Sequence, residues 1–215
     1  AKSDCPLWDL SLFHKNRNFF SCCVASLIMY GATFMNVMLI NLHLQYFKDM
    51  SLIPAAMIMM IQPTVMAICT PLVGRKFDHR NAERYARTGM LLTTIGLFFL
   101  ALHNAASSLA LTAVALTITG LGFSLFSTPN ATLLMGSVDN RDLGLASSAT
   151  STTRILGQLS STAIVTLVFA VRIGGAEIMQ DEIPLLSPAI QTAFFFAACL
   201  SLLGFVFVWS LNRKA

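Results

Sequence analysis

Long stretches without any charged residue dominate this sequence. No Asp, Glu, Lys or Arg occurs in residues 18–47, 50–74, 88–138 or 183–212, and residues 143–171 contain only Arg154. Each stretch reaches or exceeds the roughly 20 residues that an α-helix needs to cross about 30 Å of hydrocarbon, and residues 88–138 are long enough for two crossings. The sequence therefore predicts six membrane spans, at about residues 18–45, 54–74, 86–103, 108–133, 144–171 and 188–211.

The overall composition argues against a soluble globular domain. Charged residues make up 11% of the chain and hydrophobic residues 55%, whereas a soluble domain carries about 25% charged residues. Backbone polar groups inside a bilayer must be hydrogen-bonded internally, so we expect the spans to be helices. The predicted fold class is an all-α membrane protein with one six-helix bundle at residues 18–211. A linker at residues 1–17 and a short tail at residues 212–215 flank the bundle.

The basic residues are divided unequally between the two sides of this predicted bundle. Eleven of the fourteen Lys and Arg residues lie in the N-terminal segment, in the connections after the second and fourth spans, and in the C-terminal tail. The opposite side has only Lys48 and Arg172. The positive-inside rule therefore predicts that both termini are cytoplasmic. This topology accounts for the net charge of +4, and we do not expect nucleic-acid binding.

Polar side chains inside the predicted spans are concentrated in four of the six. The third and sixth spans are rich in large apolar residues, which suits helices at the periphery. Polar side chains in a membrane face the protein interior or a water-filled cavity. We therefore expect the first, second, fourth and fifth spans to line a shared cavity. Its candidate residues are Asn36, Asn41, Gln45, Gln62, Asn130, Arg154 and Gln158.

Arg154 is the one charged residue well inside a predicted span, since Arg87 is the second residue of the third span. It lies about ten residues into the fifth span, roughly 15 Å from its start at 1.5 Å per residue. A charge near the bilayer centre costs about 2.5 kcal/mol or more, so a functional or conformational role is one interpretation. The alternative is that its side chain reaches the headgroups. The same span has a small residue at every fourth position (Ala149, Thr153, Gly157 and Ser161), which predicts close packing against another helix.

Pro63 removes a backbone hydrogen bond within the second span, so we expect a bend there.

His43, near the external end of the first span, could titrate near neutral pH. A hydrogen-bonding role is the more usual one for a single histidine. His103 is expected in an external loop without a special role.

A basic motif, GRKFDHRNAER, follows the second span at residues 74–84. It resembles the cytoplasmic loop motif of the major facilitator superfamily, roughly G-R-x-x-D-R-x-G-x-R, with Gly74, Arg75, Asp78 and Arg84 as the better matches, although Arg84 lies one residue beyond the motif's last arginine. Asn81 stands where the motif has its second glycine, and asparagine also adopts left-handed backbone conformations. In that superfamily the Asp and Arg side chains bridge helix ends and hold one state of the transport cycle. The resemblance implies this role for Asp78 and Arg75.

Further motifs in the same order narrow the resemblance. Residues 6–19, PLWDLSLFHKNRNF, are similar to the linker before the C-terminal six helices of the fourteen-span drug:proton antiporters of that superfamily. Segments 120–129 and 143–157 follow the same pattern, so the resemblance covers essentially the whole chain.

The resemblance implies the C-terminal half of a proton-coupled multidrug or small-molecule exporter that works by alternating access in a bacterial inner membrane. Its partners would be the lipid bilayer, the N-terminal half of the transporter and a small amphipathic substrate. Methionines at positions 57, 59, 60 and 66 suit substrates of varied shape. The acidic residues that bind protons in these antiporters usually lie in the N-terminal half. The six spans here contain no carboxylate.

Two other classes of function were considered for this chain. A six-span scaffold or accessory subunit without transport activity is the alternative, and it predicts a stable partner other than a homologous bundle. An intramembrane enzyme fits poorly, because a serine protease needs a serine and a histidine placed together. A metal site needs clustered ligands, and the four histidines are dispersed. We therefore expect no enzymatic activity, no metal and no cofactor.

Overall fold

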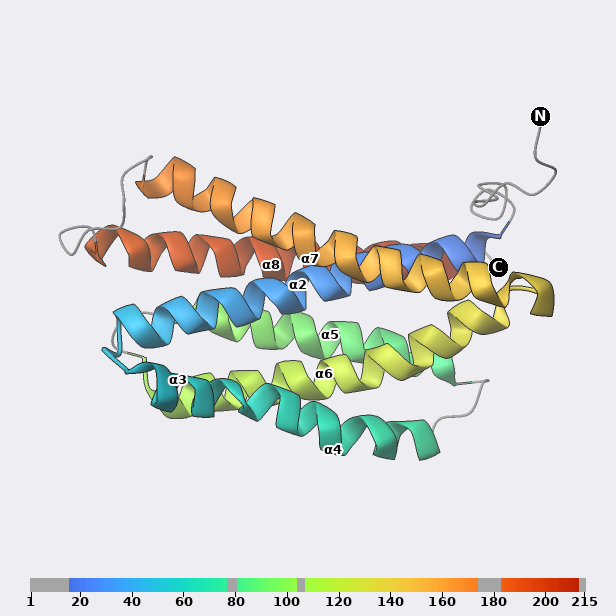
Figure 1. The fold of residues 1–215 in the computed structure, drawn as a ribbon, viewed down its shortest axis with the longest axis horizontal. Coiled ribbons are helices and arrows are strands. Elements are labelled where there is room, and N and C mark those ends of the chain that lie inside the picture. Colours follow the sequence, from blue (N-terminus) through green and yellow to red (C-terminus); the bar gives the residue numbers. More distant parts are fainter. Residues whose placement is uncertain (1–15, 77–80, 104–106, 174–182, 213–215) are drawn as a thin grey trace.

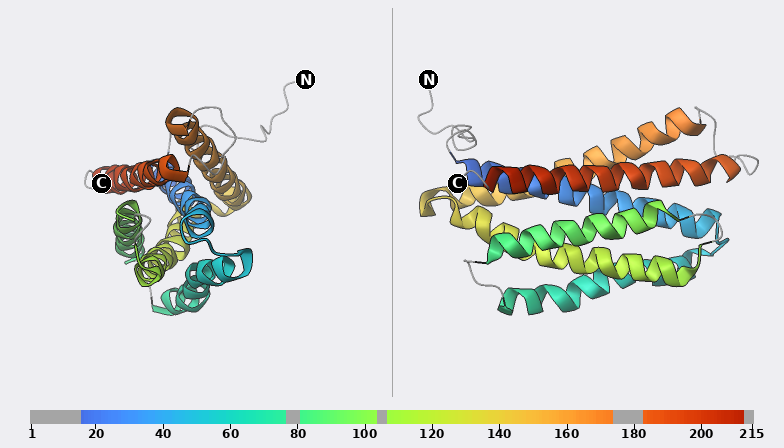
Figure 2. Two further views of the ribbon diagram at one scale, coloured as in Figure 1. Left: turned by 90° about the vertical axis from the view of Figure 1, so that its left-hand side faces the viewer. Right: turned by 180° about the vertical axis from the view of Figure 1, so that it is seen from behind.

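The computed structural model describes residues 16–76, 81–103, 107–173 and 183–212, which are helical apart from short connections. The helices are α2 (Arg17–Tyr46), α3 (Leu52–Met59), α4 (Ile61–Lys76), α5 (Ala82–Ala101), α6 (Leu109–Gly136), the 3₁₀ turn η1 (Asn140–Asp142), α7 (Leu143–Ile173) and α8 (Ile183–Asn212). They lie along one another and alternate in direction, with α3 and α4 forming one pass (Figure 1). As a result, α2 begins and α8 ends at the same end of the bundle (Figure 2). Most of the predicted linker and tail, at residues 1–15 and 213–215, lies outside the described residues.

The central helix of the bundle is α2, as the end-on view in Figure 2 shows. It contacts α6, α7 and α8. In its most apolar 18-residue window 56% of the residues are buried, compared with 11% in α3–α4 and 17% in the helix that includes α7. The helix starts at an asparagine cap, because the Asn16 side chain accepts a hydrogen bond of 3.0 Å from the Phe19 N–H.

Glycines allow α5 and α6 to pack backbone against backbone. A Cβ on Gly89 would lie 2.5 Å from the Gly122 carbonyl oxygen, and a Cβ on Gly122 would lie 2.6 Å from the Thr93 nitrogen. Such close approach is how helices associate in lipid, where no hydrophobic force drives them together. On its other side α5 is joined to α8 by a hydrogen bond of 2.8 Å between the Thr94 and Ser201 hydroxyls.

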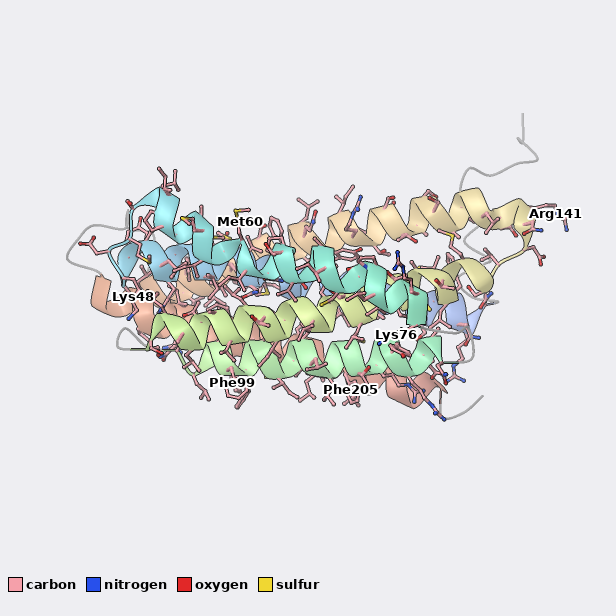
Figure 3. All side chains as sticks on the ribbon, turned by 90° about the horizontal axis from the view of Figure 1, so that it is seen from below. Lys48, Met60, Lys76, Phe99, Arg141 and Phe205 are labelled. Atoms are coloured by element: carbon pink, nitrogen blue, oxygen red, sulfur yellow. The ribbon has the colours of Figure 1, made fainter. Side chains whose placement is uncertain are left out.

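The outward surfaces of α5 and α8 consist of large apolar side chains. Figure 3 shows Phe99 and Phe205 along this edge of the bundle. Four phenylalanines, Phe98, Phe99, Phe195 and Phe196, are each at least two-fifths exposed. These faces suit contact with lipid chains, as expected for the peripheral helices of the bundle.

The second span is broken into α3 and α4 at Met60. The sequence predicts a bend at Pro63, and the break lies three residues earlier. Pro63 has no N–H to donate to the carbonyl of Met59, four residues before it, and its ring collides with that carbonyl in a regular helix. The strain therefore appears one turn before the proline. Pro129, by contrast, lies inside the continuous helix α6.

Five helical segments of the described chain are long and apolar enough to cross a membrane: α2, α3–α4, α6, η1–α7 and α8. The helix α5 is not among the five. It has 20 residues, and its first turns carry Glu83, Arg84 and Arg87. The fold is thus all-helical, with five candidate membrane-spanning segments.

We predict that Gly89→Val destabilises the bundle, because the added methyl groups would collide with the α6 backbone. Overpacking of this kind costs about 1–3 kcal/mol, which corresponds to a fall of roughly 3–10 °C in the melting temperature of a chain this size. The measurement is thermal unfolding of the purified protein in detergent. Gly144→Val is the matched control, because a Cβ on Gly144 meets nothing within 4 Å. Equal melting temperatures for the two variants would contradict this account.

Candidate functional site

One side of the bundle is poorly covered, and we call it the open face. It is the side on which α2 lies between α3–α4 and α7, which make no substantial contact with each other. Phe34 and Val37 of α2 are 39% and 44% exposed there, although the helix is otherwise well buried. The residues predicted to line a cavity fall on or just behind this face.

Two of the predicted cavity amides, Asn36 and Asn130, join helices inside the bundle. The Asn36 Nδ2 donates to Gln62 Oε1 at 2.8 Å, and both residues are buried, which connects α2 to α4. Asn130 Nδ2 donates to the Ser26 hydroxyl at 2.8 Å and to the Cys22 carbonyl at 3.3 Å, which connects α6 to α2. In lipid each such bond contributes about 0.6–2 kcal/mol to helix association. Asn36 and Asn130 therefore lie in the packed interior, behind the open face.

Asn41 and Gln45 form a pair along α2. The Gln45 Nε2 donates to Asn41 Oδ1 at 2.6 Å, one helical turn away, and both side chains are half-buried. This pair satisfies one polar atom on each side chain and leaves the others available to a neighbour.

Arg154 and Gln158 lie one turn apart on α7. Arg154 is exposed and Gln158 is half-buried. Within the described part of the chain no carboxylate pairs with the Arg154 guanidinium. Helix α7 packs along α2, with Gly157 against the α2 backbone. Arg154 thus places an uncompensated positive charge beside α2.

A pocket of about 420 Å³ lies between α2 and the break that separates α3 from α4. Most of its lining is apolar, with Met59, Met60 and Met66 on one side and Val37 and Ile40 of α2 on the other. Figure 3 shows Met60 on the α7 side of α3–α4, away from α5. Gln62 is the one amide side chain among the lining residues. The pocket therefore combines adaptable apolar side chains with a single amide.

The small-residue face predicted on α7 packs against α2. A Cβ on Gly157 would lie 2.4 Å from the Leu27 carbonyl oxygen, and a Cβ on Gly31 would lie 3.2 Å from the Gly157 carbonyl oxygen. Ala149 and Ser161 on the same face of α7 are buried. The predicted close packing is confirmed, and it occurs where the two backbones touch.

The predicted cytoplasmic loop residues lie at the ends of α4 and α5. Gly74 and Arg75 are exposed in the last turn of α4, and Arg84 is exposed in the first turn of α5. Asp78 falls outside the described residues. Nearby, Arg87 forms an ion pair with Glu83 one turn earlier on α5.

Sequence reasoning missed a pair of buried histidines at the opposite end of the bundle. The rings of His43 and His103 are 5.6 Å apart between centroids and nearly perpendicular, and each residue is 3% exposed. The His103 Nδ1 lies 3.1 Å from the Phe99 carbonyl and must carry a proton to bond it, so Nε2 faces the Thr112 hydroxyl at 3.0 Å. Gln191 of α8 donates to the His103 carbonyl at 2.6 Å. His103 therefore joins the ends of three helices, and no local sequence signal links residues this far apart.

Comparison with known proteins places this bundle in a family. The sequence model of the Major Facilitator Superfamily matches residues 4–162. The chain belongs to the Major Facilitator Superfamily. Members of this superfamily are transporters, so the chain is a multi-pass membrane protein and not an enzyme.

Individual relatives within the superfamily are longer than this chain. It is 28% identical to the riboflavin transporter RibZ of Clostridioides difficile over 96% of its own length and 45% of the relative's. It is 30% identical to the drug efflux pump JefA of Mycobacterium tuberculosis over 83% of its length and 35% of the relative's. The multidrug resistance protein Stp of the same organism is 28% identical over 79% of this chain and 31% of the relative. The chain thus spans less than half the length of these superfamily members.

We predict that His103 and Thr112 are energetically coupled in this superfamily member. His103→Leu and Thr112→Val should each destabilise the bundle. The double variant should be less destabilised than the sum of the two, by about 0.5–1.5 kcal/mol, because the second change removes a bond that is already lost. The measurement is a double-mutant cycle of unfolding in mixed micelles.

The control cycle for this coupling pairs His103→Leu with Thr117→Val. The Thr117 hydroxyl bonds only within its own helix, to the Ala113 carbonyl at 2.8 Å. Its effect should add to that of His103→Leu. Additivity in both cycles would show that the His103–Thr112 bond does not contribute.

Proposed function

We propose that this chain forms the C-terminal six-helix half of a secondary active transporter. The transporter exports small amphipathic molecules across a bacterial inner membrane by alternating access. The sixth crossing is α5, whose 20 residues extend about 30 Å at 1.5 Å per residue and which runs between α6 and α8 in the bundle. Both termini lie in the cytoplasm because the basic residues concentrate at that end.

The observation that carries this proposal is the open face. The two outer helices there, α3–α4 and α7, have few buried residues, yet they carry Gln62, Arg154 and Gln158. Polar groups at membrane depth need protein or water beside them. A second six-helix bundle across the open face would meet that need and would enclose a cavity between the two halves. The greater length of the superfamily relatives leaves room for such a bundle in one polypeptide.

In this arrangement the predicted cavity residues divide into two groups. Asn41, Gln45, Arg154 and Gln158 face the cavity, and Gln62 reaches it through the pocket at the α3–α4 break. Asn36 and Asn130 hold the helices that present them. The motif residues Gly74, Arg75, Asp78 and Arg84 lie in the cytoplasmic connection, where they stabilise one state of the cycle.

Proton coupling is the energy source that we propose for export. The charge-free parts of the spans, and residues 143–171 of α7, contain no carboxylate at membrane depth, so the proton-binding acid belongs to the N-terminal half. Relatives named as drug efflux pumps support an exported substrate. The relative named as a riboflavin transporter shows that the superfamily also includes members with a flat, polar ring system as cargo.

We predict that Arg154→Gln lowers the initial rate of substrate efflux about tenfold without loss of folded protein. Removing a charge-assisted contact costs roughly 1.5 kcal/mol, and 1.36 kcal/mol is a tenfold change in rate. The measurement is efflux from cells that express the complete transporter, with protein level read by immunoblot. The control is Arg172→Gln, since Arg172 is exposed near the end of α7 and bonds the Thr192 hydroxyl. Unchanged efflux in both Arg154→Gln and Gln158→Ala would show that these α7 side chains do not contribute to the transport cavity.

The mass of the native particle separates transport from the accessory-subunit alternative. We predict that the particle extracted from membranes contains a polypeptide at least twice this length, or this chain paired with a homologous bundle. Native mass spectrometry with denaturing mass analysis of each component gives the answer. This chain bound to an unrelated protein would instead favour a scaffold role.

A further inference from the structure

In the pocket at the α3–α4 break, the orientation of the Gln62 side chain is fixed by a hydrogen bond from a buried residue behind it. Gln62 lines the pocket, and its Oε1 accepts the hydrogen bond of 2.8 Å from Asn36. Because this bond turns Oε1 toward Asn36, the group that Gln62 offers to the pocket is its Nε2 amide, a hydrogen-bond donor.

The burial of Asn36 decides which way round this amide pair lies. Asn36 is 0% exposed, and its Oδ1 has no partner within the described part of the structure. Reversing both amides would instead bury the Asn36 NH₂ group without an acceptor. Orphaned buried N–H groups are rarer than under-satisfied carbonyls, so the observed orientation is the favoured one. Gln62 therefore presents an amide donor to the pocket, which the Thr33 hydroxyl also lines while donating to the Met29 carbonyl at 2.8 Å.

The rest of the lining selects for an apolar ring. Met59, Met60 and Met66 place three thioethers around a space of about 420 Å³. Methionine sulfur makes favourable contacts with aromatic rings and adapts to irregular outlines. The facing residues Val37 and Ile40 are stiff and branched, which suits a flat surface on the other side.

The charges of this half disfavour an organic cation. Arg154 is exposed on the open face without a carboxylate partner among the described residues. No Asp or Glu occurs in residues 50–74 or 143–171, which include both flanking helices at membrane depth. A cationic ligand in the pocket would therefore find no counter-charge at membrane depth, and a charge that leaves water without a partner carries a large desolvation cost.

We propose that this pocket is the selective part of the transport cavity in this half. It takes an uncharged, flat ring system with a carbonyl that accepts a hydrogen bond from Gln62, and Asn36 acts as a positioning residue that holds the Gln62 amide. The inference rests on the proposed function, because it assigns a substrate class to the same cavity.

The test uses two probes of the same tricyclic shape. 6(5H)-Phenanthridinone is uncharged and has a carbonyl, and 5-methylphenanthridinium is a permanent cation without one. Binding of each probe to the complete transporter in lipid nanodiscs is measured by probe fluorescence, with empty nanodiscs subtracted. We expect phenanthridinone to bind at least about tenfold more tightly than the cation, because the cation makes no hydrogen bond to Gln62 and its charge has no counter-ion in the pocket.

Variants of Gln62 and Asn36 distinguish the loss of one hydrogen bond to the ligand from a general disturbance of the pocket. Gln62→Met keeps the side-chain length and removes the donor, so it should weaken phenanthridinone about five- to tenfold and leave the cation within about twofold. Asn36→Leu should weaken phenanthridinone about two- to threefold, because the freed Gln62 amide can then turn either way. Phe195→Leu, on the lipid-facing surface of α8, is the control and should change neither probe.

Three results would overturn the inference. They are equal weakening of both probes by Gln62→Met, equal or tighter binding of the cation to the unaltered protein, and binding of neither probe. Efflux from cells is measured in parallel with the same expressed protein. Active efflux with any of these results would reject the substrate class and leave the transporter proposal standing, whereas absent efflux would count against the transporter itself.

Discussion

The hydrogen bonds between α2 and its neighbours fix the positions of the other helices. Helices in lipid gain nothing from burying one another's apolar side chains, so packing contact and interhelical bonds must hold them in place. Asn36 joins α2 to α4, and Asn130 joins α6 to α2. Since α2 also touches the α7 backbone at Gly157, three helices are positioned relative to one. The two sides of the bundle differ because these contacts are distributed unevenly around α2.

On one side, α5, α6 and α8 close over one another through glycine contacts and the Thr94–Ser201 bond, with phenylalanines facing outward. On the other side, α3–α4 and α7 are each held mainly along one edge and leave α2 partly exposed between them. A bundle that is sealed against lipid on one side and open on the other is suited to working with a second bundle.

Charge-free segments were enough to predict a helical membrane protein. A charged side chain in hydrocarbon is costly, so sequences that span a membrane contain long stretches without one. The concentration of polar residues on α2, α4, α6 and α7 is the basis for assigning the candidate site to these helices, and that assignment stays a prediction. Partners could not be predicted: Asn36 and Gln62 were assigned to a cavity separately, and their bond to each other depends on two helices meeting. His43 and His103 were considered one at a time for the same reason. The glycines of α5 were missed because large neighbouring side chains suggested a helix with lipid on most sides.

The contact between α2 and α7 has a mechanical consequence. Gly157 lies near the midpoint of α7 (Leu143–Ile173), and there the two backbones meet without interlocking side chains. Figure 1 shows the C-terminal part of α7 diverging from α2 beyond this point. Because the two backbones approach most closely there, rocking of α7 about this point would displace its two ends in opposite directions. A tilt of α7 about Gly157 would narrow the bundle at one membrane surface while widening it at the other.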